Sequence, residues 1–220
     1  MSKSLEGVLV KAPHRRHPYT EQQIEDFVRC ADPDTGPHHF MSHFFYIQHP
    51  LHGKLLYQPY EYQDRLIETY HNYRFSISMM PRQTGKSTSA AGYLLWYAMF
   101  IPDSTILVAA HKYLGAQEIM QRVRYAYEAC PDHIRAGVVS YNKGSIEFDN
   151  GSRIVSQTTT ENTGRGMSIS LLYCLDGDTT TVKIRNKKTL QEEDVTLKEL
   201  FVRLHNPGKV LDDEFGFVDK

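Results

Sequence analysis

The sequence predicts a three-layer α/β fold built around a mostly parallel sheet. Short apolar runs alternate with longer amphipathic segments through the middle of the chain, and strands alternating with crossover helices are typical of such folds. The run at 104–110 is apolar and bounded by turn residues, as a strand buried in a parallel sheet would be. Asn150-Gly151 between two strand-like runs adds a strong signal for a β-hairpin.

The composition excludes several classes of protein. The chain has 220 residues, of which 40% are apolar, so one domain and part of another can bury a core. A net charge of −1 argues against a protein that coats nucleic acid with a uniformly basic surface, although a nucleic-acid-binding protein can concentrate its basic contacts on one face. We expect no membrane partner, because there is neither a signal-peptide pattern nor an apolar run of spanning length.

Cysteine and histidine usage point to neither disulfides nor a metal. Three widely separated cysteines fit a reducing cytoplasm better than a disulfide scaffold. The histidines between residues 38 and 52 lack the spacing and the paired cysteines of a zinc site.

The first part of the chain is expected to be an arm followed by helices. Residues 1–55 form this N-terminal arm and helical lead-in. Thr20 and Gln23 have the spacing of a capping box, and apolar residues follow at helical spacing. We expect residues 31–53 to be irregular with one short helix, and residues 60–70 to be helical.

Alternating elements then follow, and Pro102 is expected to stop the longest helix. The expected strands are 75–79, 104–110, 145–148, 153–157 and 169–173, and the expected helices are 86–100 and 116–129.

The turn at 81–88 carries the strongest functional signal. It reads Pro-Arg-Gln-Thr-Gly-Lys-Ser-Thr between an expected strand and an expected helix, which is the context that a phosphate-binding loop requires. Backbone N–H groups at a helix start attract phosphate oxygens, and Gly85 lets the backbone approach them. We expect Lys86 to reach the β- and γ-phosphates of ATP and Ser87 to place its hydroxyl on Mg²⁺. Met80 stands where the full pattern has its first glycine.

This departure resembles the deviant Walker A motif of large terminases, the DNA-packaging subunits of tailed bacteriophages. In that family the form Arg-Gln-x-Gly-Lys-Ser/Thr lacks the first glycine, and its arginine acts on the γ-phosphate in cis. The resemblance gives this role to Arg82, whose planar fork suits charge developing on a transferring phosphoryl group. It implies catalytic roles for Arg82 and Lys86. The implied ATP-binding residues are Tyr62, Gln63, Arg82, Gln83, Thr84, Gly85, Lys86, Ser87 and Thr88.

Further segments resemble the same family in the same order. Residues 60–63 resemble the segment with which the family recognises adenine. There the Gln63 amide can donate to and accept from the adenine edge, and Tyr62 can stack on the ring. Lys112 follows the next strand as a candidate for DNA or phosphate contact. Arg165 is a candidate for sensing nucleotide or touching a neighbouring subunit, and the hairpin is expected to be architectural. The matching segments are 60–63, 81–88, 107–112, 142–152 and 164–166, within about residues 20–173.

The resemblance breaks after Tyr173. The family continues with an apolar residue and Asp-Glu, whose Asp supports Mg²⁺ and whose Glu polarises the attacking water. This chain reads Cys174-Leu175-Asp176-Gly177 instead. One interpretation is a shifted Walker B motif with Asp176 as the metal carboxylate and no adjacent base. The other, which we favour, is that Cys-Leu-x-Gly-Asp-Thr-x-x-Val resembles the opening block of an intein.

The intein interpretation makes Cys174 a splicing nucleophile that attacks the carbonyl of Tyr173. Residues 174–220 are then a β-rich, N-terminal fragment of a Hint-type intein. Within it, the alternation at 180–185 predicts a surface strand, and Thr196 and Glu199 have the spacing of a second capping box before a short helix. No Thr-x-x-His follows Cys174, and there is no terminal His-Asn. We therefore expect either a truncated sequence or one half of a split intein that needs a C-terminal partner.

The sequence thus predicts an incomplete P-loop ATPase domain of the RecA/ASCE-like kind at 56–173, ending in its Walker B strand. The resemblance implies ATP hydrolysis with Mg²⁺ that drives double-stranded DNA into a procapsid. It also implies a portal and a small terminase subunit as partners, and action in the host cytoplasm. The fragment alone is expected to bind nucleotide weakly and to hydrolyse negligibly. The alternative is a helicase-like P-loop ATPase, distinguished by its downstream domain.

Overall fold

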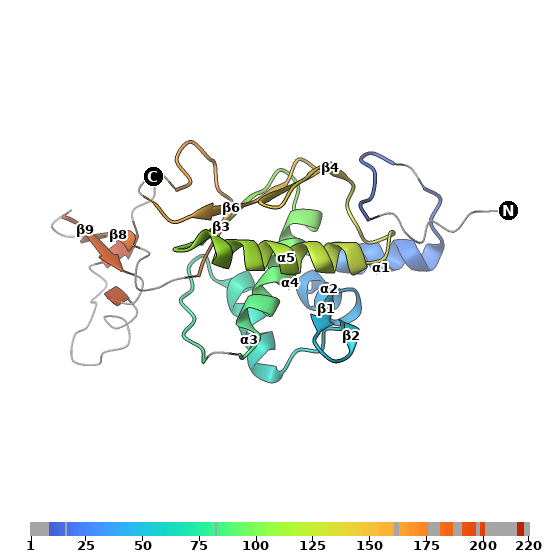
Figure 1. The fold of residues 1–220 in the computed structure, drawn as a ribbon, viewed down its shortest axis with the longest axis horizontal. Coiled ribbons are helices and arrows are strands. Elements are labelled where there is room, and N and C mark those ends of the chain that lie inside the picture. The colour runs from blue at the N-terminus through green and yellow to red at the C-terminus, as the bar shows by residue number, and fades with distance from the viewer. Residues whose placement is uncertain are drawn as a thin grey trace.

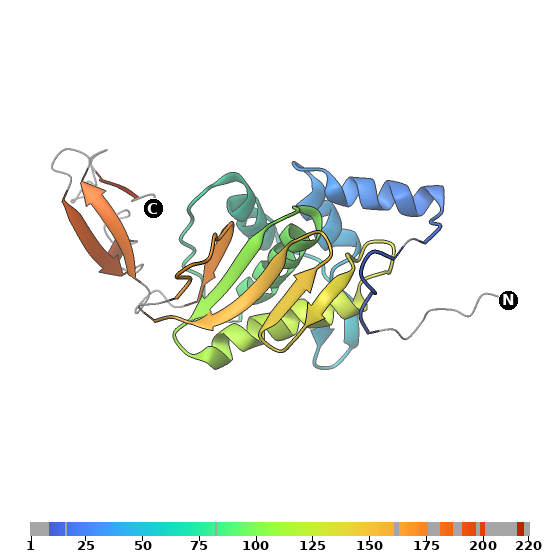
Figure 2. The same cartoon turned by 90° about the horizontal axis from the view of Figure 1, so that it is seen from above.

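The computed structural model describes residues 9–15, 17–81, 83–160, 163–175, 181–186, 191–196, 199–200 and 215–217. They form a five-stranded sheet with helices packed beneath it, a two-stranded hairpin and a three-stranded sheet (Figures 1 and 2). No helix in this described part is both long and apolar enough to cross a membrane.

The five-stranded sheet has the order β4-β5-β6-β3-β7. The central strand β3 (Thr105–Ala110) pairs in parallel with β6 (Arg153–Thr158) on one side and with β7 (Leu171–Cys174) on the other. Strand β5 (Ser145–Phe148) is antiparallel to β6, and β4 (Val138–Tyr141) is antiparallel to β5. The sheet is therefore mixed. The expectation of a mostly parallel sheet is wrong, because the Asn-Gly hairpin and the unpredicted β4 add antiparallel pairs.

The helices cover one face of this sheet. Helices α4 (Lys86–Phe100) and α5 (Tyr113–Ala129) lie below the strands in Figure 1, and the view from above shows the other face without a helix (Figure 2). Within the described residues the domain thus has two layers rather than the expected three. The ends of α4 were predicted correctly, whereas α5 begins before the expected residue 116.

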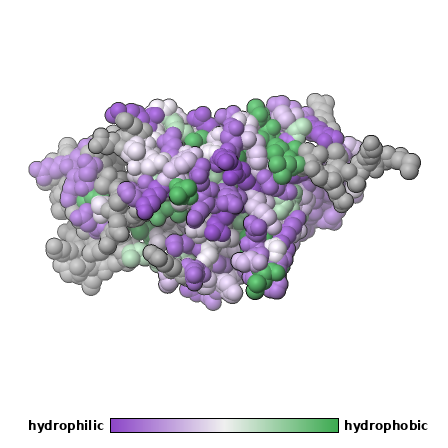
Figure 3. All heavy atoms as spheres, in the orientation of Figure 1, coloured by the Kyte–Doolittle hydropathy of each residue, from purple (hydrophilic) through white to green (hydrophobic). Residues whose placement is uncertain are grey.

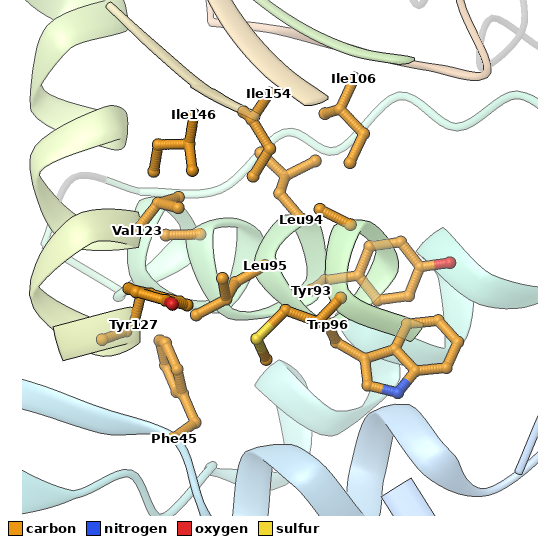
Figure 4. Close-up of a cluster of buried hydrophobic side chains, with 14 of the residues drawn as sticks. Phe45, Tyr93, Leu94, Leu95, Trp96, Ile106, Val123, Tyr127, Ile146 and Ile154 are labelled. Atoms are coloured by element: carbon orange, nitrogen blue, oxygen red, sulfur yellow. The ribbon is translucent and has the colours of Figure 1, made fainter. Parts of the chain in front are cut away.

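The core lies between the sheet and α4. Ile106, Ile146 and Ile154 point down from neighbouring strands toward Leu94 and Leu95 of α4 (Figure 4). The run 86–100 is apolar nearly all round because both sides of the helix are covered. The face seen in Figure 3 is mainly hydrophilic, with small separate apolar patches. The large apolar side chains that are fully buried are Trp96, Tyr127, Phe40, Phe45, Met41, Ile67, Leu94, Leu95, Ile106, Leu107, Ile119 and Met120.

The lead-in begins with the predicted capping box. The Gln23 amide donates to Thr20 Oγ1 at 3.3 Å, and the Thr20 amide donates to Gln23 Oε1 at 3.0 Å. Helix α1 (Glu21–Ala31) starts there, followed by α2 (Gly36–His43) and the predicted α3 (Glu61–Asn72).

A two-stranded hairpin lies between α2 and α3. Its strands, β1 (Tyr46–His49) and β2 (Gly53–Leu56), pair antiparallel. The sequence did not predict this hairpin, because its histidines and Pro50 mask any apolar alternation.

The expected strand at 75–79 is not formed. Residues 73–80 are irregular, and Phe75 and Met79 are 50% and 65% exposed. Strand β7 ends the sheet on this side in the described part of the chain. A single extended segment gains no ladder hydrogen bonds, which explains why an apolar run alone did not become a strand.

The last described residues form a separate three-stranded antiparallel sheet with the order β10-β8-β9. Strand β8 (Thr181–Asn186) corresponds to the expected strand at 180–185, and it pairs with β9 (Glu192–Thr196) and β10 (Phe215–Phe217). The Glu199 amide donates to Thr196 Oγ1 at 3.1 Å, as the second predicted capping box requires. The rest of the helix expected there lies outside the described residues.

Candidate functional site: the turn before helix α4

The turn that precedes α4 contains two residues with a left-handed backbone. Gln83 has φ 65° and Gly85, which caps the helix start, has φ 76°. A left-handed glutamine is strained, and such strain in a native turn points to a function. Left-handed residues beside right-handed ones gather backbone N–H groups into a concave nest that suits anions. The first N–H groups of α4 also lack acceptors inside the helix and carry partial positive charge.

Glycine is required at position 85 for two reasons. Its left-handed φ disfavours any side chain. A Cβ atom there would also stand 2.4 Å from Nε2 of Gln63, closer than real Cβ contacts. The turn and the start of α3 are therefore packed directly against each other.

The predicted ligands Lys86, Ser87 and Thr88 occupy the first turn of α4 and are half-buried. The amides of Thr88 and Ser89 donate to the Gly85 carbonyl at 2.9 and 3.0 Å, which fixes this turn. Arg122 of α5 donates to Thr88 Oγ1 at 3.4 Å and brings a second cation to the helix start. Nothing in the sequence singled out Arg122, because a helix-surface arginine has no local signature.

Gln63 lies against the turn with its side chain only 5% exposed. Its Oε1 accepts from the Tyr57 hydroxyl and from the Tyr60 amide, both at 3.0 Å. Its Nε2 donates to the Thr84 carbonyl at 2.9 Å. The adenine contact suggested for Gln63 stays a prediction, and the structure adds a direct contact with the turn.

Tyr62 contacts the same carbonyl. Its hydroxyl donates to Thr84 O at 3.1 Å, and its ring stacks on that of Tyr60 at 5.7 Å between centroids. Both rings are exposed, at 43% and 67%. An exposed aromatic pair beside the turn suits stacking on a base.

Tyr57 and Ser89 connect the core to this turn. The Tyr57 hydroxyl lies 2.7 Å from Ser89 Oγ, and Ser89 Oγ lies 3.3 Å from the Gly85 carbonyl oxygen. Burial raises the pKa of Tyr57 to about 12, so its phenol keeps its proton at neutral pH. Sequence reasoning missed both residues, because a contact across 32 positions leaves no local pattern.

Two predicted residues, Arg82 and Asp176, lie outside the described residues, so their roles stay predictions. Lys112 is exposed and precedes α5 at the carboxyl end of β3. Arg165 is exposed between two left-handed glycines, Gly164 and Gly166. Among the described residues no group of three or more His, Cys, Asp or Glu could hold a metal ion.

The predicted splicing junction lies at the end of β7, the outermost strand of the five-stranded sheet in the described part of the chain. Tyr173 is opposite Val108 and Cys174 is opposite Ala109, whose carbonyl accepts from the Leu175 amide at 3.0 Å. Burial raises the pKa of the Cys174 thiol to about 11. In this arrangement the thiol is therefore almost entirely protonated at neutral pH.

Comparison with known families adds one finding. Residues 77–181 match the family model described as terminase large subunit, T4likevirus-type, N-terminal. The matched range contains the turn before α4 and the parallel strands β3, β6 and β7, and it extends beyond Cys174. It supports the large terminase subunit as the family that this segment resembles, and favours it over the helicase-like alternative.

Proposed function

We propose that this chain contains the front part of the ATP-hydrolysing motor domain of a phage large terminase subunit, which drives double-stranded DNA into a procapsid. The family match over residues 77–181 carries the proposal. The nest-like turn at the start of α4 supports it independently, because its geometry suits phosphate.

Each residue at the turn has a proposed role. The exposed amides at the start of α4 and the Lys86 ammonium would bind the β- and γ-phosphates of ATP, and Ser87 would hold Mg²⁺. Arg82 would stabilise the charge that develops on the γ-phosphate. Tyr62 would contact the adenine, because its ring is exposed beside the turn. Gln63 would contact the adenine only as a donor, through the second hydrogen of Nε2, because its Oε1 already accepts two hydrogen bonds.

The proposed partners follow from the family rather than from a contact in the structure. They are double-stranded viral DNA, the portal of the procapsid and a small terminase subunit, met in the host cytoplasm during assembly. Lys112 and Arg165 are the proposed contacts with DNA, nucleotide or a neighbouring subunit, since both side chains are exposed.

We further propose that an intein begins at Cys174. The Cys174 thiol would attack the Tyr173 carbonyl carbon, the C–N bond to Cys174 would break, and the thiol proton would pass to the released amine. A thioester replaces the amide, and the atoms balance. The intein-like block at 174–182 and the separate three-stranded sheet that follows it support this proposal.

One observation favours a second candidate, an uninterrupted ATPase with Asp176 as the acid of a shifted Walker B motif. The family match continues past the junction and includes Asp176. In that case Cys174 would be a small strand residue with no chemical role.

Nucleotide binding tests the motor proposal. A fluorescent ATP analogue titrated with Mg²⁺ should bind the chain weakly and should lose most of that affinity in Lys86→Ala. The exposed Lys143 provides the matched control, since Lys143→Ala removes an equal charge far along the chain from the turn. Equal binding by the wild type and Lys86→Ala would refute the phosphate-loop assignment.

Turnover and mass spectrometry separate the two candidates. An intein interruption predicts negligible ATP hydrolysis, and a ligated product only when a C-terminal intein half is added and Cys174 is intact. Cys174→Ala should abolish that product without changing ATP binding. Robust hydrolysis that disappears in Lys86→Ala and in Asp176→Asn would support the shifted motif and contradict the interruption.

A further inference from the structure

The Thr84–Gly85 peptide has a fixed orientation in this structure. Its carbonyl oxygen accepts from Gln63 Nε2 at 2.9 Å and from the Tyr62 hydroxyl at 3.1 Å. In a planar trans peptide the C=O and the following N–H point in opposite directions. The Gly85 N–H must therefore point away from α3.

The Gln63 amide that holds this carbonyl is itself held. Its oxygen has two donors, the Tyr57 hydroxyl and the Tyr60 amide, each at 3.0 Å. With both lone pairs occupied, the amide is fixed in one of its two orientations, with the nitrogen toward Thr84. Without the Tyr57 hydroxyl, one of these two donors would be lost.

Ser89 lies on the other side of the Tyr57 hydroxyl. Its Oγ is 2.7 Å from the Tyr57 oxygen, and since the Tyr57 proton goes to Gln63, the Ser89 hydroxyl is the donor in this contact. Tyr57 is 3% exposed, and its ring packs edge-on against Phe45 at 5.3 Å between centroids. The hydroxyl is thus a rigid point in the core, and one chain of hydrogen bonds runs from Ser89 through Tyr57 and Gln63 to the Thr84 carbonyl.

We propose that Tyr57 is a positioning residue of the phosphate-binding turn, acting through Gln63 on the Thr84 carbonyl, with Ser89 holding the Tyr57 hydroxyl in place. It keeps the amides of the turn directed at the phosphates before nucleotide arrives. The inference rests on the proposed ATP-binding function of that turn. A buried residue outside the sequence motif thus helps to set the orientation of the phosphate-binding turn.

Tyr57→Phe tests the inference, because it removes the hydroxyl and leaves the ring in place. Inorganic tripolyphosphate, competing with a fluorescent ATP analogue, isolates the phosphate contacts from those of the base. We expect about a fivefold loss of tripolyphosphate affinity in Tyr57→Phe, the effect of one lost hydrogen bond. Ser89→Ala should show a similar loss. The matched control is Tyr73→Phe, since Tyr73 is 66% exposed.

The double variant Tyr57→Phe/Ser89→Ala provides a second criterion. Residues that act through one network are not additive, so the double variant should lose less affinity than the product of the two single losses predicts. Tripolyphosphate affinity equal to wild type in a folded Tyr57→Phe protein would overturn the inference. So would fully multiplicative losses.

A readout without nucleotide separates this inference from the proposed function. In NMR relaxation measurements, the backbone amide of Gly85 should become more mobile in Tyr57→Phe and stay unchanged in Tyr73→Phe. An unchanged Gly85 amide refutes the positioning role. If the wild type binds neither ATP nor tripolyphosphate while the amide still responds, the proposed function fails and only the structural link between Tyr57 and the turn remains.

Discussion

The side-chain amide of Asn150 donates a hydrogen bond to the carbonyl oxygen of Ala98 at 2.9 Å, which joins the hairpin turn to the end of α4. The same amide donates to Met99 O at 3.1 Å, and its oxygen accepts from the Ser152 amide at 3.0 Å. The last carbonyls of a helix have no partner within it. The hairpin, expected to be architectural, is thus the C-terminal cap of the central helix.

Asn150→Ala should therefore destabilise the domain, because it leaves these carbonyls without donors. We expect the free energy of unfolding to fall by about 1–3 kcal/mol, measured by urea denaturation. Asn142→Ala is the matched control, since Asn142 is exposed. Its side-chain amide donates a hydrogen bond to Ser140 Oγ at 3.1 Å rather than to a helix end. Equal stability of the two variants would contradict a capping role.

Gly85→Ala should disturb the turn more than backbone strain alone predicts. The substitution meets both a φ of 76° and a Cβ position 2.4 Å from Gln63 Nε2. Gly53→Ala separates these effects, because Gly53 has φ 67° and nothing within 4 Å of its Cβ position. Left-handed strain costs about 1–2 kcal/mol, and we expect this for Gly53→Ala.

For Gly85→Ala we expect a larger loss of unfolding free energy, together with weakened binding of a fluorescent ATP analogue. Urea denaturation and nucleotide titration of both variants provide the comparison. If Gly85→Ala and Gly53→Ala lower the free energy of unfolding equally, then the Gln63 side chain moves aside without cost. The turn would then not be packed tightly against Gln63.

Alkylation of Cys174 should be slow at neutral pH and should accelerate as pH rises toward 11. Burial raises the pKa of this thiol from 9.0 to about 11. Because only the thiolate reacts, the reactive fraction at neutral pH is about 100-fold smaller than for the unshifted thiol. Iodoacetamide labelling followed by peptide mass spectrometry measures the rate, with the denatured chain as reference. Equal rates in the folded and denatured chains would refute the partly buried placement of Cys174.

The same shift has a consequence for stability, with a defined sign. The folded state holds the thiol proton more tightly than the unfolded state, so this group favours folding below pH 9 and loses that contribution between pH 9 and about 11. Cys174→Ser should reduce the loss of unfolding free energy over this interval. Urea denaturation at a series of pH values provides the measurement, and an identical pH dependence in both proteins would contradict it.

The sequence predicted elements whose signals are local. Helix α4 was located to the residue, because an apolar run stands between Gly85 and Pro102. Asn150-Gly151 likewise located the β5–β6 hairpin. The strand expected at 75–79 failed because a strand depends on a partner, and partners are not encoded in the run itself.

The candidate site likewise contains residues that a local motif predicts and residues that only tertiary contacts bring together. The motif located Lys86 and Ser87 at the start of α4, where the structure has them. Tyr57 and Ser89 escaped prediction, because their contacts arise only when the core brings distant segments together. Side-chain contacts of this kind follow from tertiary packing and leave no periodicity to detect.

The position of the Tyr173–Cys174 bond within the β3–β7 ladder has a kinetic consequence for a chain that splices there. A peptide group aligned in a sheet cannot adopt the bent geometry that an acyl shift from nitrogen to sulfur demands. Each opening of the strand forfeits several backbone hydrogen bonds at about 1 kcal/mol apiece, so only a small fraction of molecules would be reactive at any moment. Splicing needs the Tyr173–Cys174 segment to be free, whereas folding of the five-stranded sheet needs the same segment as β7. The two processes would therefore compete. The intein would have to act before β7 docks, during or soon after synthesis.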